Sequence, residues 1–173
     1  MRLFIAINFS AATKNALLGL RDELRGCSES GNFTLPENLH LTLSFLGECS
    51  ARQASAAKSA MDAVSFEAFD ASIERIGRFG RGEGESLWFA ALRETKPLLD
   101  FQRDLADELS ASGFDLDRRK FSPHITLGRR VITTAVPRRI EPFGETVRKI
   151  DLMDSGRIGG KLTYTAIYST NCT

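Results

Sequence analysis

The sequence has almost no net charge. Lysine and arginine together number 23 and aspartate and glutamate 22, which leaves a formal charge of +1. A protein that wraps long duplex nucleic acid must neutralise many phosphates at once, so this balance argues against that class. A site for one phosphate or one strand end stays compatible with it, because a few local arginines suffice.

Cysteine is also scarce. Only Cys27, Cys49 and Cys172 are present, far apart and without a CxxC pair. An odd number at such spacing fits neither a disulfide framework nor a cysteine-based zinc site. The sequence therefore predicts reduced, structural thiols.

Long hydrophobic runs are missing. No stretch approaches the roughly 20 apolar residues that span a bilayer, and the apolar run near Met1 is too short for a signal peptide. We therefore expect a cytoplasmic protein with no membrane contact. The 173 residues, 42% hydrophobic and 26% charged, are typical of a single globular domain over residues 1–173, and a monomer is the default at this balanced charge.

Hydrophobic periodicity predicts a mixture of helices and strands. The expected helices are one that follows a cap at Ser10 or Thr13, one over Ser50–Val64, and one that begins near Pro97 and ends at Gly113. Loops are expected at Gly26–Asn32, at the glycine-rich turn Gly80–Ser86, and around Gly156, Gly159 and Gly160. The expected strands are Arg2–Phe9, Leu39–Leu46, Phe69–Phe79, Ser86–Leu92, Lys120–Arg130, Glu145–Met153 and Lys161–Thr170.

The order of these elements lacks regular β-α alternation, which predicts an α+β fold with mainly antiparallel sheets. Each half of the chain has a helix followed by a strand with one histidine. This coarse duplication predicts two lobes joined at a central cleft.

The chain has two histidines, and both lie in the same short frame. Leu39–Leu43 reads LHLTL and Pro123–Leu127 reads PHITL. On a strand, alternate side chains share a face, so His40 and Thr42 point to one side, and so do His124 and Thr126. One such motif is commonly structural, but a matched pair favours a shared site.

Two strands that present an imidazole and a hydroxyl can hold a tetrahedral anion from both sides. Imidazoles titrate near neutrality, so one can act as base and the other as acid. That pairing suits displacement at phosphorus, with Arg129 as a supporting cation if the strand twists or bulges near Gly128. Stacking of a base on Phe4, Phe33 or Phe121 is a weaker hypothesis, because each fits a core position.

A metal site is the alternative chemistry. Two histidines with Glu37, Glu48 or Asp117 could ligate zinc or iron. No HxH or HxxxH spacing exists, and no acid lies between the histidine and threonine of either motif. The sequence therefore favours a site without metal.

The chain resembles the 2H phosphoesterase superfamily, specifically the RNA 2′,3′-cyclic phosphodiesterases once described as 2′-5′ RNA ligases. The matching segments are RLFIAI, PENLHLTLSFLGE, SLWFAAL and FSPHITLGR, and Ser155, Gly160 and Tyr164 near the end are similar but less diagnostic. The resemblance implies a two-lobed, pseudo-twofold fold around a central cleft, without metal or other cofactor. Phe33 stands where this family commonly has a tryptophan.

The resemblance also implies roles for single residues. His40 and His124 would be catalytic, with His40 as general acid and His124 as general base, and Thr42, Thr126 and Arg129 would bind substrate. The substrate would be an RNA 3′ end with a 2′,3′-cyclic phosphate, or a cyclic nucleotide, opened to a 2′-phosphate. Two alternatives stay open: a 2′-5′ RNA ligase or 2′-5′ phosphodiesterase, and a non-catalytic binder of RNA termini.

Overall fold

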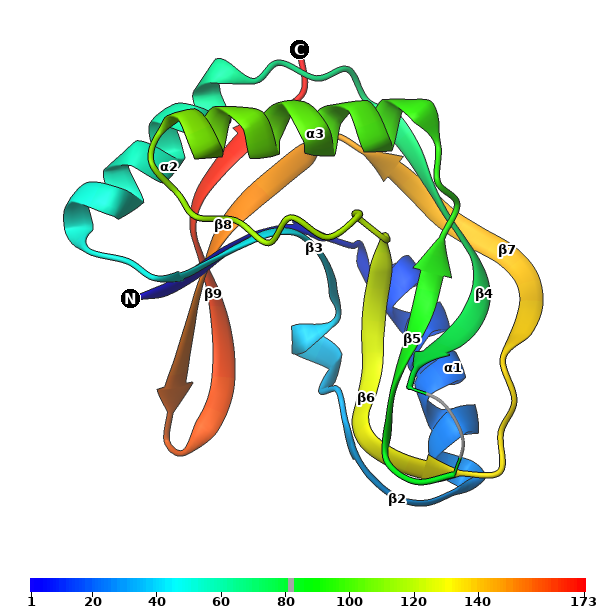
Figure 1. Cartoon of the computed structure of the whole chain (residues 1–173). Coiled ribbons are helices and arrows are strands. Elements are labelled where there is room, and N and C mark those ends of the chain that lie inside the picture. Colours follow the sequence, from blue (N-terminus) through cyan, green and yellow to red (C-terminus); the bar gives the residue numbers. More distant parts are fainter. Residues whose placement is uncertain (81–82) are drawn as a thin grey trace.

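Two β-sheets form the centre of the protein in a computed structural model, which describes residues 1–80 and 83–173 (Figure 1). The strands are β1 (Arg2–Asn8), β2 (Ser28–Phe33), β3 (His40–Glu48), β4 (Phe69–Phe79), β5 (Ser86–Leu92), β6 (His124–Thr133), β7 (Arg138–Val147), β8 (Lys149–Ile158) and β9 (Lys161–Asn171). The helices are α1 (Ala11–Gly26), α2 (Ala51–Ala63) and α3 (Lys96–Ala111), with a short 3-10 turn at Pro36–Asn38.

The first sheet has the strand order β3-β1-β8-β9, and the second has the order β2-β6-β5-β4-β7. Every strand pair described within them is antiparallel. The predicted α+β fold with mainly antiparallel sheets is confirmed. Each sheet contains one of the two histidine strands, β3 in the first and β6 in the second.

The helix boundaries follow local chemistry. The Ser10 side chain caps α1, so of the two expected caps the structure uses Ser10. Ser50 and Gln53 form a reciprocal capping box at the start of α2. Gly113, with φ +93°, follows α3 in a conformation that favours glycine, as expected for a helix end.

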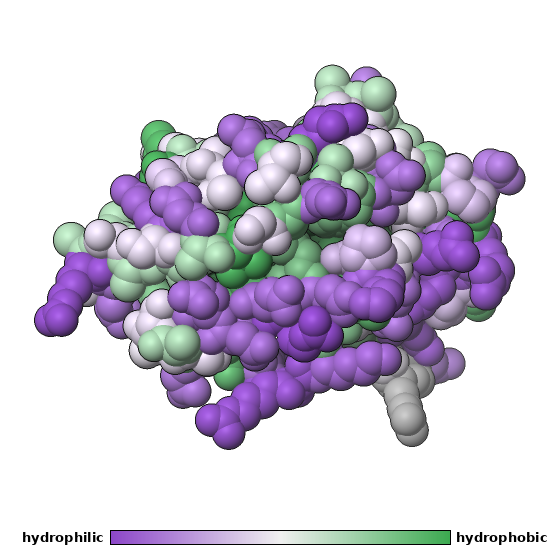
Figure 2. Space-filling view, turned by 90° about the horizontal axis from the view of Figure 1, so that it is seen from above, coloured by the Kyte–Doolittle hydropathy of each residue, from purple (hydrophilic) through white to green (hydrophobic). Residues whose placement is uncertain are grey.

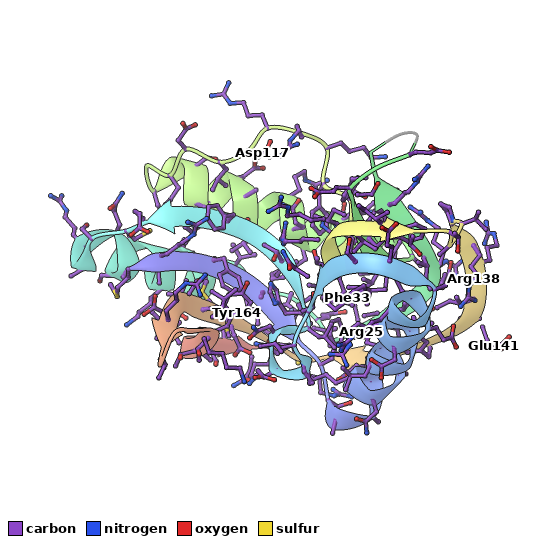
Figure 3. All side chains as sticks on the ribbon, turned by 90° about the horizontal axis from the view of Figure 1, so that it is seen from below. Arg25, Phe33, Asp117, Arg138, Glu141 and Tyr164 are labelled. Atoms are coloured by element: carbon purple, nitrogen blue, oxygen red, sulfur yellow. The ribbon has the colours of Figure 1, made fainter. Side chains whose placement is uncertain are left out.

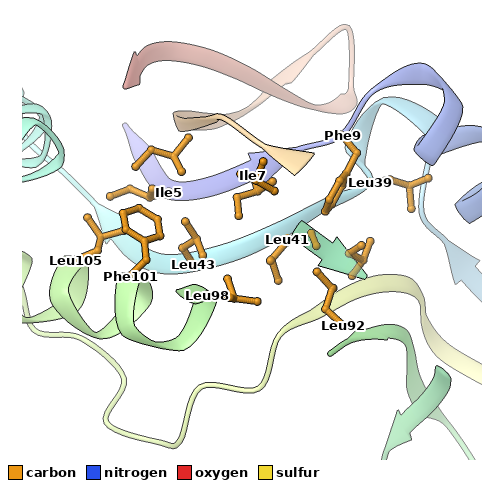
Figure 4. Close-up of a cluster of buried hydrophobic side chains, with 14 of the residues drawn as sticks. Ile5, Ile7, Phe9, Leu39, Leu41, Leu43, Leu92, Leu98, Phe101 and Leu105 are labelled. Carbon is orange, nitrogen blue, oxygen red and sulfur yellow. The ribbon is translucent and has the colours of Figure 1, made fainter. Parts of the chain in front are cut away.

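One part of the main core lies between the first sheet and α3 (Figure 4). Leu41 and Leu43 of β3 are buried on the side of the strand opposite its histidine. They belong to the same cluster as Leu98, Phe101 and Leu105 of α3. Burial of each such side chain contributes about 1.5–3 kcal/mol, so the apolar residues of the motif fix the strand that presents His40.

One predicted loop is wrong, and one strand was largely missed. Ser28–Phe33 is strand β2 where a loop was expected, and most of β7 was missed. Both are edge strands of the second sheet. Their polar residues, and Pro142 within β7, are tolerated there because an edge strand leaves one side unpaired.

Two predicted strands have the wrong limits. The strand expected from Lys120 begins at His124, just after Pro123, which lacks a backbone donor. The strand expected over Glu145–Met153 is divided at Arg148, where the chain leaves β7 in the second sheet and enters β8 in the first. The β8–β9 turn is at Gly159–Gly160, while Gly156 lies within β8.

The expected hairpin of β4 and β5 is present. Part of its glycine-rich turn, residues 81–82, lies outside the described residues. The face seen from above has a broad band of hydrophilic residues broken by smaller hydrophobic areas (Figure 2). Within the described ranges, no helix is long and apolar enough to cross a membrane.

Candidate active site

The two histidine strands, β3 and β6, lie next to each other where the two sheets meet. His40, Thr42, His124 and Thr126 all line one cleft of about 600 Å³. On both strands these polar residues are half-buried, while the residues between them, Leu41 and Ile125 among them, are fully buried. Alternation along each strand therefore brings the four residues to one place.

His40 is held from several sides. Its Nδ1 lies 2.8 Å from the carbonyl oxygen of Asn38, which can only accept, so Nδ1 carries the proton. In the neutral ring Nε2 then accepts a hydrogen bond from the Thr42 hydroxyl, at 3.0 Å. The rings of Phe4 and Tyr164 lie 4.9 and 5.2 Å from the imidazole, centre to centre.

This enclosure changes the acidity of the ring. Burial, the largest effect, lowers the pKa of His40 to about 4, and the nearby positive charges of Lys14 and Arg129 act in the same direction. The hydrogen bond to the Asn38 carbonyl opposes the shift. The imidazole of His40 is therefore neutral at pH 7 when the cleft holds no anion.

His124 has the same backbone anchor. Its Nδ1 lies 2.7 Å from the carbonyl oxygen of Ser122, two residues earlier, as His40 does with Asn38. Its neighbours are the rings of Phe79 and Phe89, at 5.1 and 5.4 Å. Both histidines therefore keep Nδ1 on a carbonyl, which leaves Nε2 for proton transfer.

A β-bulge brings Arg129 into the cleft. Along the β5–β6 ladder Phe89 pairs with Thr126 and Trp88 with Gly128, so Leu127 is an extra residue. Leu127 and Gly128 are both buried, after which Arg129 is exposed on the histidine side and lines the cleft. The conditional prediction of a bulge near Gly128 is thus met.

Several residues weighed from the sequence lie elsewhere. Glu37 is ion-paired with Lys161, which lowers the pKa of its carboxyl, and Asp117 is ion-paired with Arg119. Neither they nor Glu48 line the cleft. Among the described residues, no group of three His, Cys, Asp or Glu side chains could hold a metal ion.

The three candidate stacking residues also lie in different places. Phe4 lines the cleft, but Phe33 and Phe121 do not. Phe33 packs against the core, with the Arg25 guanidinium 6.0 Å from its ring, apart from Tyr164 (Figure 3). Stacking on Phe33 is therefore not supported.

The cleft includes residues that the sequence did not mark as site residues. Asn38 is buried, and its Nδ2 donates to the Leu162 carbonyl at 3.2 Å, while its Oδ1 has no hydrogen-bond partner among the described residues. Tyr164 covers His40 from β9. No local pattern indicates either, because each reaches the site through the pairing of distant strands. The other cleft residues that the sequence did not mark are Arg2, Thr34, Phe45, Ser155, Gly156, Arg157 and Leu162.

A family model described as the 2′-5′ RNA ligase superfamily matches residues 20–156. The chain belongs to this superfamily. Curated relatives named RNA 2′,3′-cyclic phosphodiesterase agree: that of Thermotoga maritima is 31% identical over 75% of this chain and 70% of its own length. That of Archaeoglobus fulgidus is 29% identical over 86% and 80%. The relative from Geobacillus stearothermophilus is longer, and 41% of it is matched, at 29% identity over 73% of this chain.

Solved members of the superfamily have the same fold. Escherichia coli LigT in its apo form superposes with a TM-score of 0.85 at 25% identity, over 99% of this chain and 97% of LigT. LigT has also been solved in complex with 3′-AMP, and that structure matches equally well, over 99% and 98% of the two chains. The resemblance seen in the sequence is thus confirmed.

Proposed function

We propose that this protein is an RNA 2′,3′-cyclic phosphodiesterase that opens cyclic phosphate ends to 2′-phosphates by two-histidine acid–base catalysis. The observation that carries the proposal is the convergence of both HxT motifs and Arg129 on one cleft. The names of the curated relatives support the same reaction.

In the proposed reaction, water attacks phosphorus as the bond from phosphorus to O3′ breaks. His124 Nε2 accepts a proton from the water, and His40 Nε2 donates one to O3′. Thr42, Thr126 and Arg129 bind the non-bridging oxygens, where negative charge accumulates. Positioning and charge stabilisation suffice for this displacement, so no covalent intermediate is needed.

The low pKa of His40 sets a condition on this scheme. As general acid, His40 must carry a proton that it lacks in the free protein at pH 7. An anion close to an imidazole favours its charged form, so the bound phosphodiester would raise the pKa of His40. Substrate binding would thereby favour the protonated His40 that the role of general acid requires.

We also propose that residues 1–173 act as one two-lobed domain, as a monomer in the cytoplasm, on RNA 3′ ends or cyclic nucleotides. The cleft that both histidine strands line, the nearly neutral charge and the scarcity of cysteine support this proposal.

The test is incubation of the purified protein with 2′,3′-cyclic nucleotides and an oligonucleotide with a cyclic phosphate end, in EDTA, followed by location of the product phosphate. We expect a 2′-phosphate from the wild type and none from His40→Ala or His124→Ala. Linear 2′-5′ dinucleotides are assayed beside them, because ligation is the reverse of ring opening and uses the same groups. Turnover of these alone, or binding without turnover of any substrate, would contradict the proposal.

A further inference from the structure

The cleft extends beyond the residues that one cyclic phosphate needs. From His40 the lining continues along β3 to Phe45, five residues further on. Arg2 of β1 and Arg157 of β8 line the same end. The register β1–β3 and β1–β8 places both near the start of β1, away from the histidines.

Phe45 has an unusual environment for a phenylalanine. Phe45 is 50% exposed, although most of the chain's phenylalanines are buried or half-buried. The guanidinium of Arg2 lies 5.1 Å from the centre of its ring. An exposed aromatic ring beside an arginine is a surface on which a nucleobase can stack, since bases stack on aromatic rings and on guanidinium planes.

The pseudo-twofold relation of the motif strands supports a distinct role for Phe45. HLTLSF and HITLGR have the same burial pattern. Each strand also has a bulge whose extra residue, Leu43 or Leu127, directly follows its threonine. Phe45 therefore occupies on β3 the place that Arg129 occupies on β6. One strand presents a cation to the phosphate, and the other presents an aromatic ring.

The charge of this end favours an anionic ligand. Among the described residues that line the cleft, three are arginines and none is acidic. Arg157 is held by a hydrogen bond from Nη1 to the Gly160 carbonyl at 2.9 Å, which leaves the rest of its guanidinium for a phosphate. Of these three arginines, Arg129 is the one whose charge lowers the pKa of His40, so we assign Arg2 and Arg157 to a second phosphate.

We propose that Phe45, Arg2 and Arg157 form a subsite for the nucleotide that precedes the 3′-terminal one. Its base stacks on Phe45, and the linking phosphate binds Arg2 and Arg157. The substrate is then an RNA strand rather than a mononucleotide. This inference rests on the proposed function for the identity of the terminal group.

The kinetic test compares a mononucleoside 2′,3′-cyclic phosphate with a dinucleotide that ends in the same group. We expect kcat/KM to favour the dinucleotide by roughly 5- to 100-fold, the range of one stacked base. Phe45→Ala and Arg2→Gln should move this ratio towards one. The controls Arg119→Gln and Val136→Ala, both on exposed residues outside the cleft, should leave it unchanged.

A dinucleotide without the penultimate base distinguishes the contribution of base stacking from that of phosphate binding. On that substrate Phe45→Ala should cost nothing further, whereas Arg2→Gln should still reduce kcat/KM. Equal kcat/KM for mononucleotide and dinucleotide in the wild type would overturn the subsite while leaving the proposed function intact.

A binding measurement keeps the inference testable if no turnover is found. Fluorescence anisotropy with a labelled oligonucleotide ending in a 2′-phosphate should show weaker binding to Phe45→Ala by roughly 5-fold or more. Arg157→Gln should reduce the salt dependence of log Kd by about 0.7, the value for one phosphate on a single strand. Affinities equal to wild type would overturn the subsite whether or not the protein is an enzyme.

Discussion

The strands β3 and β6 have the same local backbone structure, but their histidines have different neighbours. Both have a histidine with Nδ1 on the carbonyl two residues earlier, then a threonine on the same face, then a bulge. His40 is enclosed by Phe4 and Tyr164, and its Nε2 is bonded to Thr42. Repeated backbone geometry therefore supplies two similar groups, and the neighbours make them chemically unequal.

The two strands also differ in the residues that follow the extra residue of each bulge. Gly128 sits at the bulge of β6, where an added Cβ would come 2.8 Å from a Val131 methyl. The equivalent residue of β3 is Ser44, which is buried without that restriction. Close packing thus fixes the bulge that delivers Arg129, while β3 delivers Phe45 from the same position.

The largest expected effect comes from removing either histidine. His40→Ala and His124→Ala should each lower kcat on the cyclic substrate by about 10²- to 10⁴-fold. With a p-nitrophenyl phosphodiester, whose leaving group needs no proton, the loss for His40→Ala should shrink while that for His124→Ala persists. Steady-state kinetics on both substrates measure this, and the opposite pattern would exchange the acid and base roles.

The next effect concerns the cation delivered by the bulge. Arg129→Gln should lower kcat by about 10²-fold, because it removes a charged donor from oxygens that gain negative charge in the transition state. The matched control is Arg130→Gln, whose side chain is ion-paired with Glu85 outside the cleft. Circular dichroism verifies folding, and near-normal kinetics for Arg129→Gln would remove this residue from the site.

Much of this comparison was predictable from the sequence, because the motif pair and the alternation of Leu41 and Ile125 with the polar residues are local. The bulge near Gly128 was foreseen only as a condition for Arg129. Asn38, Tyr164 and Phe45 were not predicted as site residues, since their positions depend on pairing between strands far apart in the chain. The missed strands β2 and β7 are sheet edges, where tertiary pairing overrides weak local propensity.

A smaller effect should appear in the pH profile. The pH dependence of kcat/KM reports the free enzyme and should show an inflection near pH 4, the pKa of His40. Tyr164→Ala would admit water to the imidazole, reduce the desolvation and move this inflection up towards 6.5. Tyr164→Phe keeps the ring and should leave the inflection in place. An unchanged inflection in Tyr164→Ala would show that the Tyr164 ring does not set the pKa of His40.

The smallest effect is on stability, and it compares the two histidines directly. The pKa of His40 is about 4 in the folded protein and about 6.5 when unfolded, so the unfolded state binds more protons between these values. The stabilisation is complete above pH 6.5 and is lost as the pH falls towards 4. Between pH 7 and 4.5 this loss should reach about 2 kcal/mol in the wild type and should be absent from His40→Asn. Urea unfolding at both pH values measures it. His124→Asn is the matched variant: it leaves His40 and the enclosing rings of Phe4 and Tyr164 unchanged, so it should retain the wild-type loss. A loss that disappears in His124→Asn instead would contradict the assignment of this titration to His40.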